Sequence, residues 1–145
     1  SPPPVTGAPP RPSAAPGPGE YLAGLGASVT VPVTPSPAVV VLVPGGGWAT
    51  ADPLGLGALA EHLTAAGLAV ATITYGTSST GAAWPVPADD VRCAVAYAAE
   101  QVPDVPVVLV GHSAGAHLSA VVGLAPEGDG GSCPYAPREA AGVVG

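Results

Sequence analysis

One segment, residues 107–118, constrains the fold of this chain more than any other. A run of Val and Leu that favours a buried β-strand leads directly into Gly111-His112-Ser113-Ala114-Gly115, and a helix-forming stretch follows. In this context G-x-S-x-G is typical of a sharp strand-to-helix turn, in which the glycines let two backbones pass closely and the serine is strained. Because the hydroxyl would then point out above the sheet, Ser113 is a candidate nucleophile. A plain strand–helix connection is the alternative.

The other apolar segments alternate between strands and helices. Continuous apolar runs, typical of strands covered on both faces, occupy residues 38–43, 68–75 and 106–110, and another begins at 141–145. Residues 27–33 alternate and predict an edge strand, where Pro32 is tolerated. Helical patterns occupy residues 54–66 (with Asp52 as N-cap), 87–101 and 114–124. This order predicts an α/β fold with a mostly parallel sheet and helices on both faces.

Composition limits the partners of the chain. Of the 145 residues 48% are hydrophobic but only 9% are charged, and the formal net charge is −7. This charge disfavours nucleic acid and anionic membrane surfaces, and no apolar run approaches the ~20 residues of a membrane span. The histidines and cysteines lack the spacing of metal ligands, so we expect no metal and no cofactor. The sequence does not indicate an oligomeric state.

The first 19 residues are a tract of Pro, Gly, Ala and Ser. Such a tract cannot bury apolar surface, so we expect a disordered linker over residues 1–19 and a domain over residues 20–145. Linkers of this kind often join an export signal or lipid anchor to an extracellular domain. A secreted or cell-envelope location is therefore favoured over the cytoplasm.

Two cysteines, Cys93 and Cys133, form an even pair in a chain poor in cysteine. A disulfide between them would close a loop of about 40 residues and contribute roughly 3–4 kcal/mol. The alternative is two unlinked thiols, with Cys93 buried on a helix face.

A second glycine-rich segment, residues 44–48, directly follows the first continuous apolar run and is called the glycine loop here. A serine hydroxyl attacks a carbonyl only with a base to take its proton and donors to hold the oxyanion. We expect the N–H groups of Gly46, Gly47 and Ala114 to be those donors, because glycine leaves the backbone bare. Loss of one such donor costs ~3 kcal/mol in the barrier. A flexible strand-end turn is the alternative.

Together these segments resemble the H-G-G-G-W esterase branch of the α/β-hydrolase superfamily, the hormone-sensitive-lipase-like carboxylesterases. The resemblance covers residues 39–145 and is carried by Tyr75, Asp90, the run Gly45-Gly46-Gly47-Trp48 and the run Gly-His-Ser-Ala-Gly-Ala-His-Leu at residues 111–118. It implies that Ser113 is the nucleophile and that Gly46, Gly47 and Ala114 supply the oxyanion hole. The supporting residues that it implies are Gly45, Trp48, Gly111, His112 and Gly115.

The chain departs from this family at several points. Pro44 replaces the usual histidine, so we expect proline stiffness to hold the glycine loop, and Gly76 replaces an arginine. The strand pattern reaches only about the sixth strand of a fold that usually has eight. The resemblance therefore implies a truncated sheet, as in the N-terminal part of a longer hydrolase.

The catalytic acid and histidine are the largest departure, because in this family both follow the serine. No histidine follows His117, which we expect to pack or hydrogen-bond under the turn, as His112 points away from the hydroxyl. His62 belongs to an outer helix, and Asp89 and Asp90 are expected to be helix-start carboxylates. We therefore expect the acid and histidine beyond residue 145, and little or no activity from these residues alone.

The resemblance implies a serine hydrolase that cleaves small-molecule carboxylic esters of small or medium acyl chains. An amide or formamide hydrolase, such as a kynurenine-formamidase-like enzyme, would use the same groups. A non-catalytic α/β-hydrolase-like binding domain is the remaining alternative. Such domains usually lose the serine or the oxyanion loop, whereas this chain keeps both.

Overall fold

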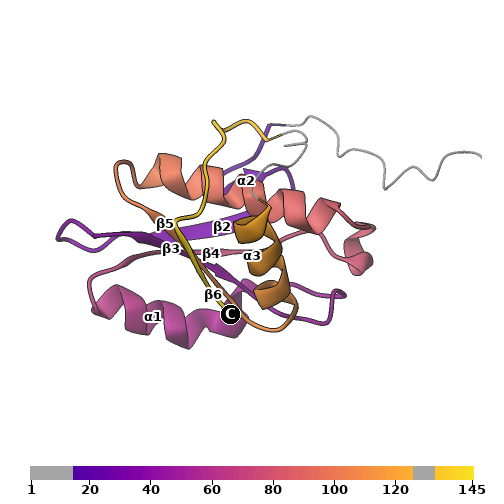
Figure 1. Ribbon diagram of the computed structural model, residues 1–145, viewed down its shortest axis with the longest axis horizontal. Coiled ribbons are helices and arrows are strands. Elements are labelled where there is room, and N and C mark those ends of the chain that lie inside the picture. The colour runs from indigo at the N-terminus through magenta and orange to yellow at the C-terminus, as the bar shows by residue number, and fades with distance from the viewer. Residues whose placement is uncertain (1–14, 126–132) are drawn as a thin grey trace, which may run out of the picture.

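In the computed structural model, which describes residues 15–125 and 133–145, the described strands form one six-stranded sheet (Figure 1). The strands are β1 (Glu20–Leu22), β2 (Leu25–Thr30), β3 (Val39–Val43), β4 (Ala69–Ile73), β5 (Val107–Gly111) and β6 (Gly142–Val144). Their order is β1-β2-β4-β3-β5-β6. The last four in this order pair in parallel, and β1 and β2 are antiparallel to their neighbours. The predicted mostly parallel α/β sheet is confirmed.

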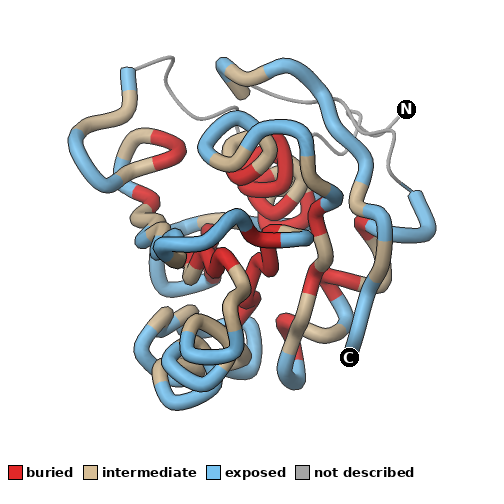
Figure 2. The backbone as a smooth tube through the Cα atoms, turned by 90° about the vertical axis from the view of Figure 1, so that its left-hand side faces the viewer, coloured by how far each residue is buried: buried red, intermediate tan, exposed pale blue. Residues whose placement is uncertain are grey.

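Helices cover both faces of this sheet (Figure 1). α1 (Gly57–Ala65) lies on one face, and α2 (Val86–Gln101) and α3 (Ala114–Leu124) lie on the other. Alternate residues of β3 enter the two cores: Val39, Val41 and Val43 pack towards α2 and α3, whereas Val40 and Leu42 pack towards α1. This burial on both faces explains the continuous apolar runs, and Figure 2 shows the buried residues concentrated between the layers.

Two local predictions differ from the structure. β2 ends at Thr30, so Pro32 lies outside it, and it is not the outermost strand because β1 pairs with Leu25 and Gly26. The predicted helix over residues 54–66 is divided into a 3-10 helix, η1 (Pro53–Leu56), and α1. Asp52 does cap this segment, since its carboxylate accepts the N–H of Leu54 at 2.9 Å, but the turn that it caps is η1.

A disulfide joins α2 to the segment that leads into β6. The sulfurs of Cys93 and Cys133 are bonded, with their Cα atoms 5.5 Å apart. Beside the bond, the rings of Tyr97 and Tyr135 pack edge to face with centroids 5.3 Å apart. The bond and the ring pair together fasten the segment after residue 132 to α2.

Removing this disulfide should weaken the fold. The double variant Cys93→Ala/Cys133→Ala is expected to lose about 3–4 kcal/mol of unfolding free energy in urea, because a closed loop spanning 40 residues restricts the unfolded chain. Dithiothreitol should lower the stability of the wild type by a similar amount and leave the double variant unchanged. Equal stability of variant and wild type would contradict this expectation.

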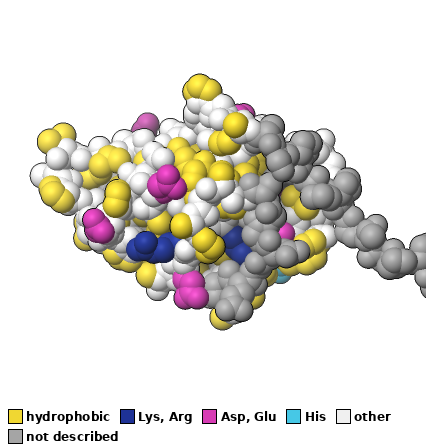
Figure 3. Space-filling model, turned by 90° about the horizontal axis from the view of Figure 1, so that it is seen from above, with side chains coloured by type: hydrophobic (Ala, Val, Ile, Leu, Met, Phe, Trp, Pro, Cys, Tyr) yellow, Lys and Arg dark blue, Asp and Glu magenta, His cyan; other side chains and the backbone are white. Residues whose placement is uncertain are grey.

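The predicted linker over residues 1–19 lies outside the described residues as far as residue 14. No helix in the described ranges is long and apolar enough to cross a membrane. Within the same ranges, no group of three or more His, Cys, Asp or Glu side chains is arranged to hold a metal ion. The face seen in Figure 3 carries few charged side chains, in keeping with the low charged content of the sequence.

Candidate active site

The turn between β5 and α3 holds Ser113 in a conformation that few non-glycine residues adopt. Its φ is 54° and its ψ is −119°, and it occupies the N-cap position of α3. A positive φ costs energy for a residue with a Cβ atom and persists only where the surroundings enforce it. The strained backbone expected at this turn is therefore present, and Ser113 is exposed at the carboxyl edge of the sheet.

Two glycines enforce this turn by leaving no room for a side chain. A Cβ atom at Gly111 would overlap the carbonyl oxygen of Gly115, and one at Gly115 would overlap that of Val43. The same Cβ at Gly115 would lie 2.6 Å from the carbonyl oxygen of Pro44. Because all these atoms belong to the backbone, no rotation of a side chain relieves the overlap. The first turn of α3 thus packs directly on the end of β3.

The glycine loop lies against this turn. A Cβ atom at Gly45 would lie 2.8 Å from the carbonyl oxygen of His112 and 3.0 Å from the Cβ of Ser113. This proximity follows from the register, in which β3 and β5 are adjacent and Val43 pairs with Gly111. The structure therefore brings Gly45 and Ser113 together, although they are 68 residues apart in sequence (113 − 45).

The backbone of the glycine loop is left-handed at three consecutive residues. The φ angles are 153° at Gly46, 60° at Gly47 and 69° at Trp48. Across the described part of the chain, the N–H groups of Gly46 and Gly47 donate no hydrogen bond to a backbone carbonyl. The N–H of Ala114 opens α3 and has no partner within that helix. These expected oxyanion donors therefore lie on the glycine loop and at the start of α3, next to the contact between Gly45 and Ser113.

Residues 74–78, which follow β4, hold the glycine loop from the neighbouring strand. The Tyr75 side chain is 1% exposed, and its hydroxyl donates to the carbonyl oxygen of Pro44 at 2.6 Å. The Ser78 N–H donates to the carbonyl of Trp48 at 3.0 Å. Proline stiffness was expected to hold this loop, and the structure adds hydrogen bonds that the sequence pattern did not reveal. The only sequence indication was the place of Tyr75 in the family resemblance, without a role.

The carboxylate of Asp90 supports residues 74–78 from α2. Asp90 is 2% exposed and accepts the N–H of Gly76 at 2.7 Å. The prediction that Asp90 is a helix-start carboxylate is wrong, because it lies beyond the first turn of α2 and bonds another loop. Asp89 does lie in that first turn, where it pairs with Arg92 at 2.8 Å. Burial raises the pKa of the Tyr75 hydroxyl, which favours the protonated form that donates to Pro44.

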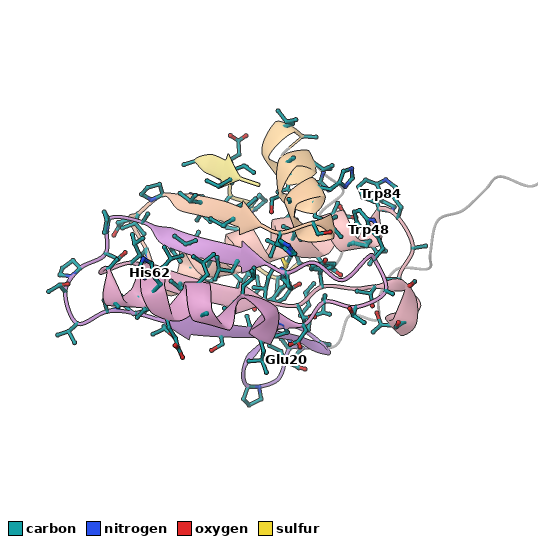
Figure 4. All side chains as sticks on the ribbon, turned by 90° about the horizontal axis from the view of Figure 1, so that it is seen from below. Glu20, Trp48, His62 and Trp84 are labelled. Carbon is teal, nitrogen blue, oxygen red and sulfur yellow. A yellow bond between two sulfur atoms is a disulfide. The ribbon has the colours of Figure 1, made fainter. Side chains whose placement is uncertain are left out.

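None of the described histidine side chains hydrogen-bonds to Ser113 within residues 15–125 and 133–145. His117, one helical turn after the serine, packs edge-on against Trp48 with ring centroids 5.2 Å apart, and it lies 6.1 Å from the Trp84 ring. His62 lies on α1, away from the two tryptophans that Figure 4 shows side by side.

An apolar cavity of about 300 Å³ adjoins the turn. Its lining residues are Trp48, Ser78, Ala82, Trp84, Pro87 and His117. They come from the glycine loop, from residues 78–87, which end in the first turn of α2, and from α3, and none of them carries a fixed charge. The cavity therefore suits an uncharged ligand held between Trp48 of the glycine loop and His117, one helical turn after Ser113.

Comparison with known proteins agrees with this architecture. The BD-FAE family model matches residues 31–134. A truncated carbohydrate esterase from gut microbiota superposes with a TM-score of 0.69 at 24% identity, over 81% of this chain and 49% of that one. The bifunctional GH43-CE of Bacteroides eggerthii superposes with a TM-score of 0.67 at 23% identity, over 81% of this chain and 18% of that one. The butyrate-bound esterase Est2 of Thermogutta terrifontis superposes with a TM-score of 0.65 at 20% identity, over 82% of this chain and 47% of that one.

At these identities the solved structures establish the fold alone, and the chain spans about half of their length or less. No curated protein matches the chain significantly. The BD-FAE model, in contrast, covers well over half of the residues, including β3, the glycine loop, β5 and the serine turn. The chain belongs to the BD-FAE family and has an α/β-hydrolase fold.

Proposed function

We propose that the complete protein is a serine hydrolase that cleaves carboxylic esters, with Ser113 as its nucleophile. The observation that carries this proposal is the left-handed backbone of Ser113 between β5 and α3, with Gly45 packed against it. A strained, exposed serine beside a loop of free N–H groups suits acyl transfer. Solved relatives described as esterases and carbohydrate esterases lend support to ester chemistry.

The reaction proceeds in two halves. The Ser113 hydroxyl oxygen attacks the ester carbonyl carbon while its proton passes to a histidine, and the negative charge collects on the carbonyl oxygen. The N–H groups of Gly46, Gly47 and Ala114 stabilise that charge. The alcohol then leaves with the proton. Water attacks the acyl-enzyme by the same route, which releases the acid and restores the serine.

The histidine and the acid of this relay belong, in our proposal, to sequence beyond residue 145. Two observations support this assignment. The histidine on α3, His117, packs against Trp48, and the chain spans about half the length of the esterases that share its fold.

The cavity favours a substrate of limited size. At about 300 Å³, with an uncharged lining that includes two indole rings, it suits an uncharged ester with a small or medium acyl group. The disulfide between Cys93 and Cys133 favours an oxidising compartment, so the proposal includes export from the cytoplasm.

A fluorophosphonate probe tests the nucleophile directly. The complete protein is expected to be labelled, and peptide mapping by mass spectrometry should find the phosphonyl group on Ser113. Ser28→Ala, which removes an exposed hydroxyl on β2, should label at the wild-type rate, whereas Ser113→Ala should not label at all. Labelling of another serine, or none in the wild type, would overturn the proposal.

A further inference from the structure

We propose that residues 74–78 position the glycine loop for catalysis, with Thr74 and Tyr75 as the positioning residues. This inference rests on the proposed function, because it concerns the loop that would hold the oxyanion. Neither side chain touches the reacting atoms. Each acts through a backbone carbonyl group, Tyr75 at the start of the glycine loop and Thr74 just after its end.

The glycine loop has little internal support for its conformation. Its residues from Gly46 to Trp48 have left-handed backbones. Just after them, the N–H groups of Ala49 and Thr50 donate hydrogen bonds to the Gly46 carbonyl at 3.1 and 3.2 Å. Those bonds close a turn, but they do not fix the distance between that turn and Ser113. Contacts from outside the loop must set that distance.

Residues 74–78 supply such contacts at the first residue of the loop, at its last residue and after it. The Tyr75 hydroxyl bonds the Pro44 carbonyl, where the loop begins, at 2.6 Å. The Ser78 N–H bonds the Trp48 carbonyl at 3.0 Å, and the Thr74 hydroxyl bonds the Ala51 carbonyl, after the loop, at 2.6 Å. β3 and β4 are parallel neighbours, so the glycine loop and residues 74–78 leave the sheet at the same edge. Hydrogen bonds can therefore join the two segments directly.

Residues 74–78 are themselves held by buried groups. The N–H of Gly76 donates to the Asp90 carboxylate at 2.7 Å, and the Tyr21 hydroxyl donates to the Thr74 carbonyl at 2.6 Å. Tyr21 and Asp90 are almost fully buried in the core between the sheet and α2. The glycine loop is therefore tied through residues 74–78 to side chains buried in the fold. Such preorganisation lets N–H donors stabilise charge without moving during the reaction.

The expected consequence is a defect in the transition state rather than in substrate binding. A displacement of about 1 Å in a catalytic group lowers rate by as much as ~10²-fold. In the complete protein, Tyr75→Phe keeps the buried ring and removes only the hydroxyl. We expect kcat for p-nitrophenyl acetate to fall about 10- to 100-fold, with KM changing less than about twofold.

An inhibitor that forms an oxyanion separates positioning from general structure. The Ser113 oxygen adds to the carbonyl carbon of a trifluoromethyl ketone while its proton passes to the histidine, which leaves a hemiketal oxyanion on the former carbonyl oxygen. The Ki of this inhibitor should therefore rise by the same factor by which kcat/KM falls. The matching secondary alcohol forms no oxyanion, and its Ki should not change. Thr74→Val, which is close in shape to threonine, should show the same pattern to a smaller extent and serves if Tyr75→Phe does not fold.

Ser36→Ala is the matched control, because the Ser36 hydroxyl accepts the N–H of Ala69 in a buried bond at the opposite edge of the sheet. It should lower Tm and leave kcat unchanged.

Wild-type kcat in both the Thr74 and Tyr75 variants would overturn the inference, as would an equal rise in the Ki of ketone and alcohol. If Ser113→Ala keeps full activity, the proposed function fails; if it is inactive while both variants are fully active, only the positioning role fails.

Discussion

Ser113→Ala is expected to lower kcat for p-nitrophenyl acetate in the complete protein by about 10⁴- to 10⁶-fold. The substitution removes the attacking oxygen and leaves everything else in place. Alanine keeps the Cβ atom, so the strained turn and its contact with Gly45 should persist. The N–H donors of the glycine loop also remain, and the residual rate would come from them and from substrate binding.

Ser28→Ala is the control for this result and should keep the wild-type kcat, since that exposed hydroxyl lies on β2, outside the serine turn. Thermal unfolding should show Ser113→Ala folded with nearly the wild-type Tm. Retention of more than a few per cent of kcat would refute Ser113 as the nucleophile. A wild-type protein that hydrolyses neither esters nor formamides would favour the non-catalytic binding domain instead.

Gly115→Ala is expected to destabilise the fold strongly, with a loss of about 3 kcal/mol or more in unfolding free energy. The new methyl group would overlap the carbonyl oxygen of Val43 and lie 2.6 Å from that of Pro44. Both oxygens are backbone atoms, at the last residue of β3 and the first of the glycine loop, so either α3 or the end of β3 must move. The glycine loop begins at Pro44, and activity should therefore fall together with stability.

Gly57→Ala is the matched substitution without overlap. Gly57 begins α1 in a right-handed conformation, and a Cβ atom there would meet no heavy atom within 4 Å. Alanine at that position should be neutral or stabilise the fold by about 0.5–1 kcal/mol, because it restricts the unfolded chain. Urea unfolding of both variants measures the difference. Equal stability of the two would mean that α3 does not pack on β3 as described.

Local chemistry made the serine turn and the central strands predictable. The glycines at 111 and 115, the serine between them and the preceding Val and Leu residues are all within a few residues of one another. The continuous apolar runs predicted buried parallel strands because residues on both faces of such strands are covered, as Val39 to Val43 are. β1 was not predicted, since Glu20–Leu22 is too short to show a period.

Contacts between distant residues were not predictable in the same way. Tyr75 and Pro44 are 31 positions apart, and Gly76 and Asp90 are 14 apart, so no spacing in the sequence links them. Asp90 illustrates the difficulty. A carboxylate near a helix start is expected to interact with the helix dipole, yet the Asp90 carboxylate accepts the N–H of Gly76 on another loop. The cavity beside the turn likewise requires three separate segments to meet.

The sequence by itself determined the α/β class, the strand-to-helix turn at Ser113 and the glycine loop, because strand burial and glycine conformation depend on neighbouring residues. Only the tertiary structure decided that Gly45 lies against Ser113, that Tyr75 holds Pro44 and that Cys93 meets Cys133. Those contacts depend on the strand order β4-β3-β5 and on the packing of α2 against the sheet. The physical reason is that strand pairing joins residues far apart in the chain, and no local pattern records which strands become neighbours.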